Sequence, residues 1–175
     1  EVSDGFEKKH FQKSTDFLLE GRGISRERTK IVLEEVLDAL RQSDLNPFVV
    51  LRLAPKNRVE EFQSYRKEID LIHEKGPVIP LLFIADLVIG MTSMPLYEAA
   101  VIGRPTLSVL PILQQRHWLS SIDLGLTRLA TTRHEIGCQI KAAIETGPLA
   151  TIVDLGNKVF PLGATKRASD FLTGL

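Results

Sequence analysis

The sequence is poor in cysteine and has no excess of charge of either sign. Cys138 is the single cysteine in 175 residues, so no internal disulfide can form and a reducing compartment is expected. Lysine plus arginine and aspartate plus glutamate both number 22, which gives a net charge of +0. Proteins that bind nucleic acid through bulk charge are more basic, so we expect no nucleic-acid partner.

Long hydrophobic runs are also absent. The longest uninterrupted apolar segment covers residues 78–85, contains Pro80 and falls far short of the roughly 20 residues that cross a bilayer. The first residues are charged and do not have the pattern of a signal peptide. We therefore expect no membrane span and a cytoplasmic protein, with peripheral attachment at the inner membrane as an alternative. Because the chain does not begin with methionine, we interpret it as an excised fragment.

The motifs of several common enzyme classes are missing. The chain has no Gly-x-Gly-x-x-Gly, no Walker loop, no Gly-x-Ser-x-Gly and no zinc-ligand spacing. This argues against a dehydrogenase, an NTPase, a serine hydrolase and a metalloenzyme. We expect no bound metal and no resident cofactor, and we interpret His10, His73 and His134 as surface or packing residues.

What the sequence does contain is an alternation of strands and helices. Apolar β-rich runs predict strands over residues 48–53, 86–90 and 106–110, and an edge strand over 126–130. Helical periodicity predicts helices over residues 25–42, with Ser25 as the cap, and over 59–74, 81–85, 95–102, 133–145 and 165–172. Because the strands are continuous apolar runs between helices, the pattern predicts the α/β class. The expected architecture is one Rossmann-like domain over residues 1–175, with a doubly wound parallel sheet in three α/β/α layers.

In such sheets, ligands bind beyond the carboxyl ends of the strands. The rule selects residues 54–57, 91–93, 111–118 and 131–133. The second of these segments places Thr92 and Ser93 before a helix whose free N–H groups and dipole attract a phosphate. Glu98, about one turn into that helix, offers a carboxylate to the diol of a ribose. Together these residues indicate a nucleotide site, and the alternative is a plain helix cap beside a solvated glutamate.

The segment 85–93, together with residues 98–100 and 103–105, resembles the nucleotide-binding part of the C-terminal domain of GT-B glycosyltransferases. These segments have the sequences ADLVIGMTS, EAA and GRP. Within that superfamily, the segments resemble those of bacterial surface-polysaccharide transferases and of the related UDP-N-acetylglucosamine 2-epimerases. The resemblance implies that Thr92 and Ser93 meet the phosphates of a nucleotide sugar and that Glu98 holds its ribose. It covers about residues 85–111 and, more thinly, 47–57.

The chain departs from that family in two respects. Residues 52–55, Arg-Leu-Ala-Pro, resemble the Arg-x-His-Pro that ends an earlier strand, but Ala54 replaces the histidine that donates to a phosphate or leaving group. A whole GT-B enzyme has two Rossmann-like domains with the active site between them, and 175 residues supply only one. We therefore expect the acceptor-binding half and its catalytic base to be absent here and the chain alone to be inactive.

The first strand of the domain is also expected to be missing. The family places a strand before the first long helix, and residues 16–19, Asp-Phe-Leu-Leu, are the only candidate. A lost central strand exposes the edges of its neighbours. The partners expected from this are a second copy of the chain or the missing N-terminal GT-B half, besides the nucleotide sugar.

Residues at the other strand ends are weaker candidates. Arg52 and Lys56 flank Ala54, where Lys56 would pair with a phosphate, although a strand-end lysine also serves solubility. Arg116 and His117 follow the strand that ends near residue 110 and are candidate catalytic residues, with a surface or packing role as the alternative.

A small basic cluster precedes the first long helix. Arg22, between Gly21 and Gly23, is followed by Arg26 and Arg28, and the glycines allow close approach of a ligand. Neighbouring glutamates nearly neutralise the cluster, so the preferred interpretation is a solvated loop.

The leading hypothesis is therefore the donor-binding domain of a glycosyltransferase of surface-polysaccharide biosynthesis. The alternatives are a sugar-nucleotide epimerase, or a non-catalytic partner module of a split or degenerate glycosyltransferase. The sequence does not specify the base, the sugar, the acceptor or the stereochemical course.

Overall fold

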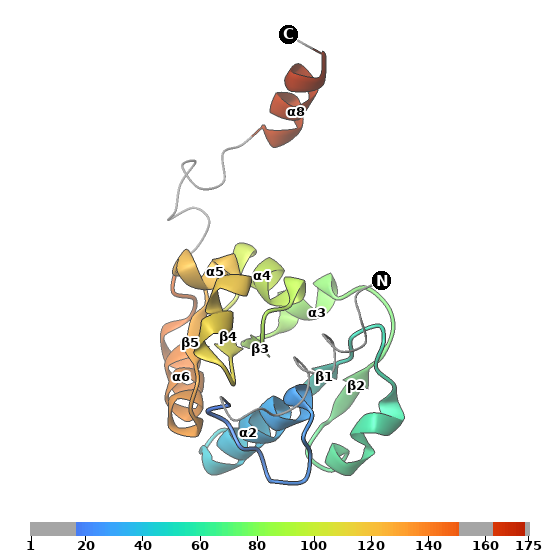
Figure 1. Cartoon of the computed structure of the whole chain (residues 1–175), viewed down its shortest axis with the longest axis vertical. Coiled ribbons are helices and arrows are strands. Elements are labelled where there is room, and N and C mark those ends of the chain that lie inside the picture. The colour runs from blue at the N-terminus through green and yellow to red at the C-terminus, as the bar shows by residue number, and fades with distance from the viewer. Residues whose placement is uncertain (1–16, 151–162, 174–175) are drawn as a thin grey trace.

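The computed structural model describes residues 17–150 and 163–173. The chain has a mixed α/β structure in which two small parallel sheets are flanked by helices (Figure 1). The first sheet pairs β1 (Val50–Arg52) with β2 (Leu71–His73). The second has the order β3 (Val88–Gly90), β4 (Thr106–Val109), β5 (Arg128–Ala130). The predicted α/β class with parallel strands is confirmed.

Helices connect the strands in the predicted alternation. In chain order they are α2 (Arg28–Gln42), the 3-10 helix η1 (Val59–Tyr65), α3 (Ile79–Ile84), α4 (Met94–Val101), the 3-10 helix η2 (Leu113–Trp118), α5 (Ser120–Asp123), α6 (Arg133–Thr146) and α8 (Ala164–Thr173). Helix α6 packs on β4 and β5, whereas α4 packs on β3 and β4. Figure 1 shows α2 and α6 on one side of the three-stranded sheet and α3 and α4 on the other.

Local sequence signals explain where several helices begin and end. Helix α6 starts at a capping box in which the Thr132 side chain accepts from the N–H of Glu135, and it ends at Gly147, whose φ is 72°. Helix α4 has Pro95 in its first turn and is followed by Gly103 with a φ of 77°. Ser25 was predicted to cap α2, but its Oγ accepts from the N–H of Glu27 before the helix, and Glu27 is the N-cap.

One predicted helix is wrong in its second half. The helix expected over residues 59–74 ends as η1 at Tyr65, and residues 71–73 form β2. The Val49 N–H donates to the Asp70 carboxylate at 2.7 Å, and Val49 O accepts from the N–H of Leu71 at 3.2 Å. Pairing with β1 therefore overrides the helical composition of residues 66–70, because sheet contacts outweigh a weak local propensity.

The candidate first strand is not a strand in the part that the structure describes. Residues 17–19 have no strand conformation, and Leu18 N donates to Pro111 O at 2.8 Å. Leu19 is nonetheless buried in the core. Asp16 lies outside the described residues, so a strand conformation at that position stays a prediction.

Helix α2 contributes to two hydrophobic clusters. Its residues Ile31 and Val36 pack with residues of β4, β5 and α6, such as Leu107 and Ile136. Its residue Leu37 packs in a second cluster made by Leu53, Phe62, Tyr65 and Ile69 around the two-stranded sheet. One helix therefore spans the cores of both sheets.

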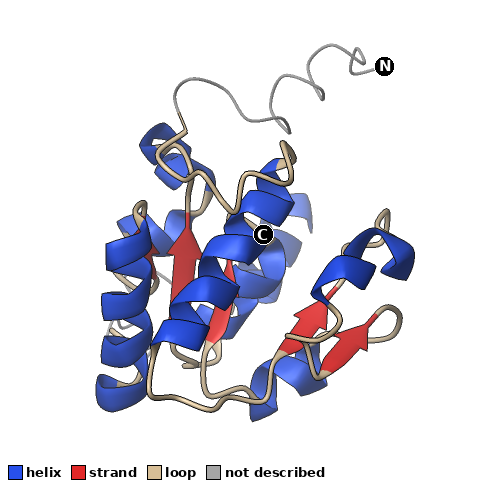
Figure 2. Cartoon of the chain, turned by 90° about the horizontal axis from the view of Figure 1, so that it is seen from below, coloured by secondary structure: helices blue, strands red, loops and turns tan. Residues whose placement is uncertain are grey.

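The doubly wound sheet is observed only in part, because the strands form two sheets. Within the described residues β1 pairs only with β2, and β3 pairs only with β4. Figure 2 shows the arrows of both sheets rising in the same general direction, with a helix between them. The edges of β1 and β3 are therefore not covered by any described strand, and neither are the outer edges of β2 and β5.

Among residues 17–150 and 163–173, no helix combines the length and the apolar character that crossing a bilayer requires.

We predict that the core around α6 is sensitive to cavity formation. Ile136 is 0% exposed, whereas Ile144 on the same helix is 45% exposed. Ile136→Ala should lower the free energy of unfolding by about 2 to 5 kcal/mol because it leaves a cavity. Ile144→Ala is the matched control and should cost less than about 1 kcal/mol. Urea unfolding of both variants tests this, and equal losses would contradict the assigned packing.

Candidate functional site

The segment after β3 positions the residues that the sequence singled out. Residues 91–93 connect β3 to α4, and the buried Ser108 of β4 donates from Oγ to Met91 O at 2.6 Å. Ser93 is the N-cap of α4, and its carbonyl accepts from the N–H of Leu96 at 3.1 Å. The bond from Ser108 therefore fixes this segment at the carboxyl end of the three-stranded sheet.

The polar side chains at this junction have no hydrogen-bond or ion-pair partner in the described part of the chain. Thr92 is half-buried and Ser93 is exposed, and neither hydroxyl has a hydrogen bond to any residue that the structure describes. Ser93 makes no side-chain capping bond, which removes the plain-cap interpretation for its Oγ. Glu98 is half-buried and its carboxylate has no ion pair within the described residues. No described residue therefore competes with a ligand for the side chains of these three predicted residues.

At the end of β5, in contrast, the polar groups are hydrogen-bonded within the protein. The Glu135 carboxylate accepts from the N–H and the hydroxyl of Thr131, at 2.7 and 3.0 Å, and from the N–H of Thr132 at 3.1 Å. The backbone bond from Thr131 contributes most to holding the pKa of Glu135 below its ordinary value. The polar groups at this end are thus satisfied by the protein itself.

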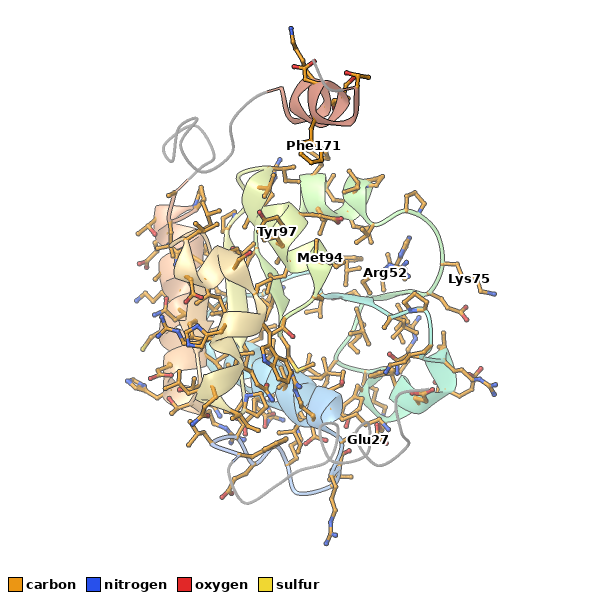
Figure 3. All side chains as sticks on the ribbon, turned by 45° about the horizontal axis from the view of Figure 1, so that its top comes forward. Glu27, Arg52, Lys75, Met94, Tyr97 and Phe171 are labelled. Carbon is orange, nitrogen blue, oxygen red and sulfur yellow. The ribbon has the colours of Figure 1, made fainter. Side chains whose placement is uncertain are left out.

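The end of β1 places Arg52 in a structural role. Its Nη1 donates to the carbonyls of His73 and Glu74, at 3.1 and 2.5 Å, and its Nη2 donates to Gly76 O at 3.0 Å. Figure 3 shows Arg52 on the side of the molecule where Lys75 lies. Because these carbonyls engage both terminal nitrogens, Arg52 orders the loop after β2.

A hollow of about 270 Å³ opens beside Arg52. It is lined by Arg52, Pro55, Asn57, Glu74, Lys75 and Gly76. Lys56 and Ala54 are exposed nearby on the turn after β1 and do not line the hollow. The structure therefore leaves the predicted nucleotide-binding role of Lys56 as a prediction.

Arg116 and His117 face α5. Arg116 Nη2 and His117 Nδ1 each lie 3.2 Å from an Asp123 carboxylate oxygen. The hydrogen bond with His117, followed by that with Arg116, holds the pKa of Asp123 below its ordinary value. Both candidates are exposed and pair with the same carboxylate, which agrees with the surface role given as the alternative.

The structure thus brings together only part of the predicted site. Thr92, Ser93 and Glu98 share one strand–helix junction, and Figure 3 shows Met94 and Tyr97 on the same helix. Arg52 and Lys56 belong to the end of a strand in the other sheet. Arg116 and His117 lie on η2.

A buried acidic face on α2 was missed by the sequence analysis. Glu34, Glu35 and Asp38 are at most 4% exposed. Arg22 donates to Asp38 at 2.7 and 3.0 Å and forms a two-pronged ion pair with Glu68, at 2.6 and 2.7 Å. The preferred interpretation of a solvated loop is therefore wrong for Arg22, which lies between two carboxylates.

The same acidic face binds other parts of the chain. Glu34 accepts from the Tyr65 hydroxyl at 2.6 Å, and Glu35 accepts from Arg133 Nε at 2.5 Å. Gly21 donates its N–H to Glu35 at 2.8 Å, and its φ is 65°. A Cβ on Gly21 would lie 2.5 Å from a Glu34 oxygen, so only glycine fits. The sequence feature that could have revealed this network is the presence of three acidic residues on the apolar side of a helix.

Burial and pairing shift the pKa values of this network. The pKa of Asp38 and that of Glu68 both lie below their ordinary values, mainly because Arg22 donates hydrogen bonds to each. Burial first, and then the bond to Glu34, raises the pKa of Tyr65 far above its ordinary value. Arg22 thus favours the ionised forms of Asp38 and Glu68.

Metal-ligating side chains do not converge among the described residues. No group of three or more histidine, cysteine, aspartate or glutamate side chains there could hold a metal ion. Cys138 Sγ lies 3.8 and 3.9 Å from the two ring nitrogens of His134, one helical turn away.

Comparison with known proteins yields no relative. No protein-family model matches the chain, and no curated protein or solved structure matches it significantly. The interpretation of the site therefore depends on its geometry and on the sequence resemblance alone.

We predict that the Arg22 ion pairs stabilise the fold above acidic pH. Arg22→Gln should lower the free energy of unfolding at pH 7 by about 2 to 4 kcal/mol, because it leaves Asp38 buried with weaker pairing. A lowered carboxyl pKa gives stability that is lost as pH falls, here below about 4.5, the ordinary value for Glu68. The difference from the parent should therefore shrink between pH 5 and pH 3.

The matched control for this experiment is Arg26→Gln, in the same loop. Arg26 is exposed, so its loss should change stability by less than about 0.5 kcal/mol. Denaturant unfolding at several pH values measures both variants. A deficit for Arg22→Gln that stays constant from pH 7 to pH 3 would contradict the assigned coupling to carboxylates.

Proposed function

We propose that the chain is the donor-binding domain of a GT-B-type glycosyltransferase of surface-polysaccharide biosynthesis, with a nucleotide sugar as its ligand. The observation that carries the proposal is the junction of β3 and α4, where Thr92, Ser93 and Glu98 have no partners among the described residues. The β5–α6 junction, by contrast, satisfies its own polar groups. The sequence resemblance over residues 85–111 assigns the same three residues to a nucleotide.

The chemistry of the junction suits a sugar nucleotide. The positive end of the α4 dipole and the hydroxyls of Thr92 and Ser93 would stabilise the charge on the departing phosphate. Glu98 lies five residues beyond Ser93, about 7.5 Å along the helix axis. A carboxylate at that position would accept hydrogen bonds from both ribose hydroxyls. The sugar would then point away from the helix toward an acceptor.

We propose that the two observed sheets are the halves of one doubly wound sheet, which helices cover on both faces in a three-layer α/β/α fold. Leu53 N donates to His73 O, and Val88 N donates to Pro105 O. Because alternate residues of a parallel strand point to opposite sides, the N–H groups of Val50, Arg52 and Ile89 point away from these partners. A strand between β1 and β3 would complete the order β2-β1-x-β3-β4-β5.

A second candidate function is a non-catalytic partner module. Two observations favour it: Ala54 has no ring nitrogen, and Arg52 is engaged by carbonyls of its own loop. The uncovered edges of β1 and β3 would suit docking with a separate N-terminal half or with a second copy. The epimerase alternative shares the proposed nucleotide site and is separated from transfer by product analysis of the whole enzyme.

We predict that one of UDP, CMP, CDP, GDP and ADP stabilises the chain. At about 100 times its dissociation constant, a ligand adds roughly 2.7 kcal/mol, which raises the Tm by several degrees. Glu98→Gln should weaken that nucleotide at least about tenfold, because it loses charged hydrogen bonds to the ribose. Thermal shift and calorimetry measure both quantities.

The control for this experiment is Glu60→Gln, an exposed acidic residue on η1. It removes the same charge and should leave nucleotide affinity unchanged. Equal affinity in the parent and in Glu98→Gln would reject the ribose assignment. Flat curves for all five nucleotides would favour the partner-module candidate.

We also predict that the position between β1 and β3 is open in the isolated monomer. The amides of Val50, Arg52 and Ile89 should then exchange with solvent faster than those of Leu51 and Gly90, which face neighbouring strands. Hydrogen exchange followed residue by residue tests this. Equal protection of both groups in a monomer would contradict the open position.

A further inference from the structure

A buried arginine lies at the start of α2 without an anionic partner among the residues that the structure describes. Arg28 is 5% exposed, and its Nε is buried without a hydrogen-bond partner. The guanidinium carbon lies 5.8 Å from the centroid of the Trp118 ring, within the range of a cation–π contact. Burying an unpaired charge is costly, so native proteins pair such groups with an anion or a ligand.

The carboxylates of α2, and those of the elements beside Trp118, are engaged by other residues. On α2, Glu34 and Glu35 bind Tyr65 and Arg133, and Asp38 binds Arg22. On α5, the Asp123 carboxylate is joined to Arg116 and His117. Glu27, just before the helix, pairs with Lys30. No described carboxylate therefore neutralises Arg28.

The end of α2 adds positive potential at the same place. The helix has 15 residues, its first turn contains no acidic residue, and no side chain caps it. Its dipole is equivalent to about half a positive charge at this end. Long side chains in a helix lean toward the N-terminus, so the Arg28 guanidinium lies over this end of α2. Burial without a countercharge also lowers the pKa of Arg28 from its ordinary value.

We propose that Arg28 and the N-terminal turn of α2 form an anion site that takes the phosphate group of a phosphorylated ligand, with Trp118 as its outer wall. A phosphate oxygen matches the planar donors of a guanidinium and the positive end of a helix. Trp118 is 54% exposed and lies on η2, directly after β4, so an anion reaches Arg28 beside its ring. The site stands on a different helix from Thr92 and Ser93 and does not depend on the nucleotide proposal.

Trp118 is the single tryptophan of the chain, so its fluorescence reports on this site directly. The test titrates the full chain with sodium phosphate and sodium pyrophosphate at constant ionic strength, with sodium chloride as the reference. We expect a saturable change in Trp118 emission and a rise in Tm with the phosphates and not with chloride. The absence of any saturable change in the parent chain would overturn the proposal without the need for a variant.

Two variants of equal charge change locate the response. Arg28→Met should weaken phosphate binding at least about tenfold and, in phosphate-free buffer, should keep or raise the Tm because a buried unpaired charge is removed. Arg26→Met, which changes an exposed side chain two residues earlier, should leave both the titration and the Tm near those of the parent. An unchanged titration in Arg28→Met would overturn the proposal. So would a large loss of Tm in that variant in phosphate-free buffer, because it would assign Arg28 to packing.

Glu98→Gln separates this site from the proposed nucleotide site. The phosphate response of Trp118 should persist in Glu98→Gln even where nucleotide binding is lost. A phosphate response that disappears with Glu98→Gln would overturn the separate site. If none of the five nucleotides binds the parent while pyrophosphate does, the nucleotide proposal is rejected and the anion site remains supported.

Discussion

The buried acidic face of α2 is the constraint on which the arrangement of the chain depends. Glu34, Glu35 and Asp38 are buried, and an ionised carboxylate in that position needs partners. The partners come from both halves of the molecule: Arg133 from α6 beside the three-stranded sheet, and Tyr65 from η1 beside the two-stranded sheet. The two sheets share no hydrogen-bonded strand pair among the described residues. Helix α2, through its polar face and its two apolar clusters, is therefore what joins them.

Much of the fold could be predicted because its signals are local. The apolar run of residues 106–110 and the Thr132–Glu135 capping box each identify an element without tertiary information. β2 could not be found in this way, because residues 66–70 favour a helix and only pairing with β1 makes residues 71–73 a strand. The role of Arg22 was missed for a similar reason. Its partners Asp38 and Glu68 are 16 and 46 residues away, and no local pattern shows that they meet.

The candidate site was predictable to the extent that it is contiguous in the chain. Thr92, Ser93 and Glu98 lie on one strand–helix unit, so the rule for strand ends and the dipole of the helix identify them directly. Arg52 was chosen by the same rule, yet its guanidinium is used by carbonyls of the loop after β2. These hydrogen bonds depend on the position of β2, a strand that the sequence did not reveal. The junction of β3 and α4 differs in that its polar side chains have no partners within the described part of the chain. Only a three-dimensional structure can show such a lack of partners.

A structure of the chain with a bound nucleotide is the most direct test of the central claim that the junction of β3 and α4 holds a sugar nucleotide. The claim predicts a phosphate within hydrogen-bonding distance of Thr92 or Ser93 and ribose hydroxyls on the Glu98 carboxylate. A nucleotide seated instead in the hollow beside Arg52, or at any place that leaves Glu98 without a ligand contact, would contradict it.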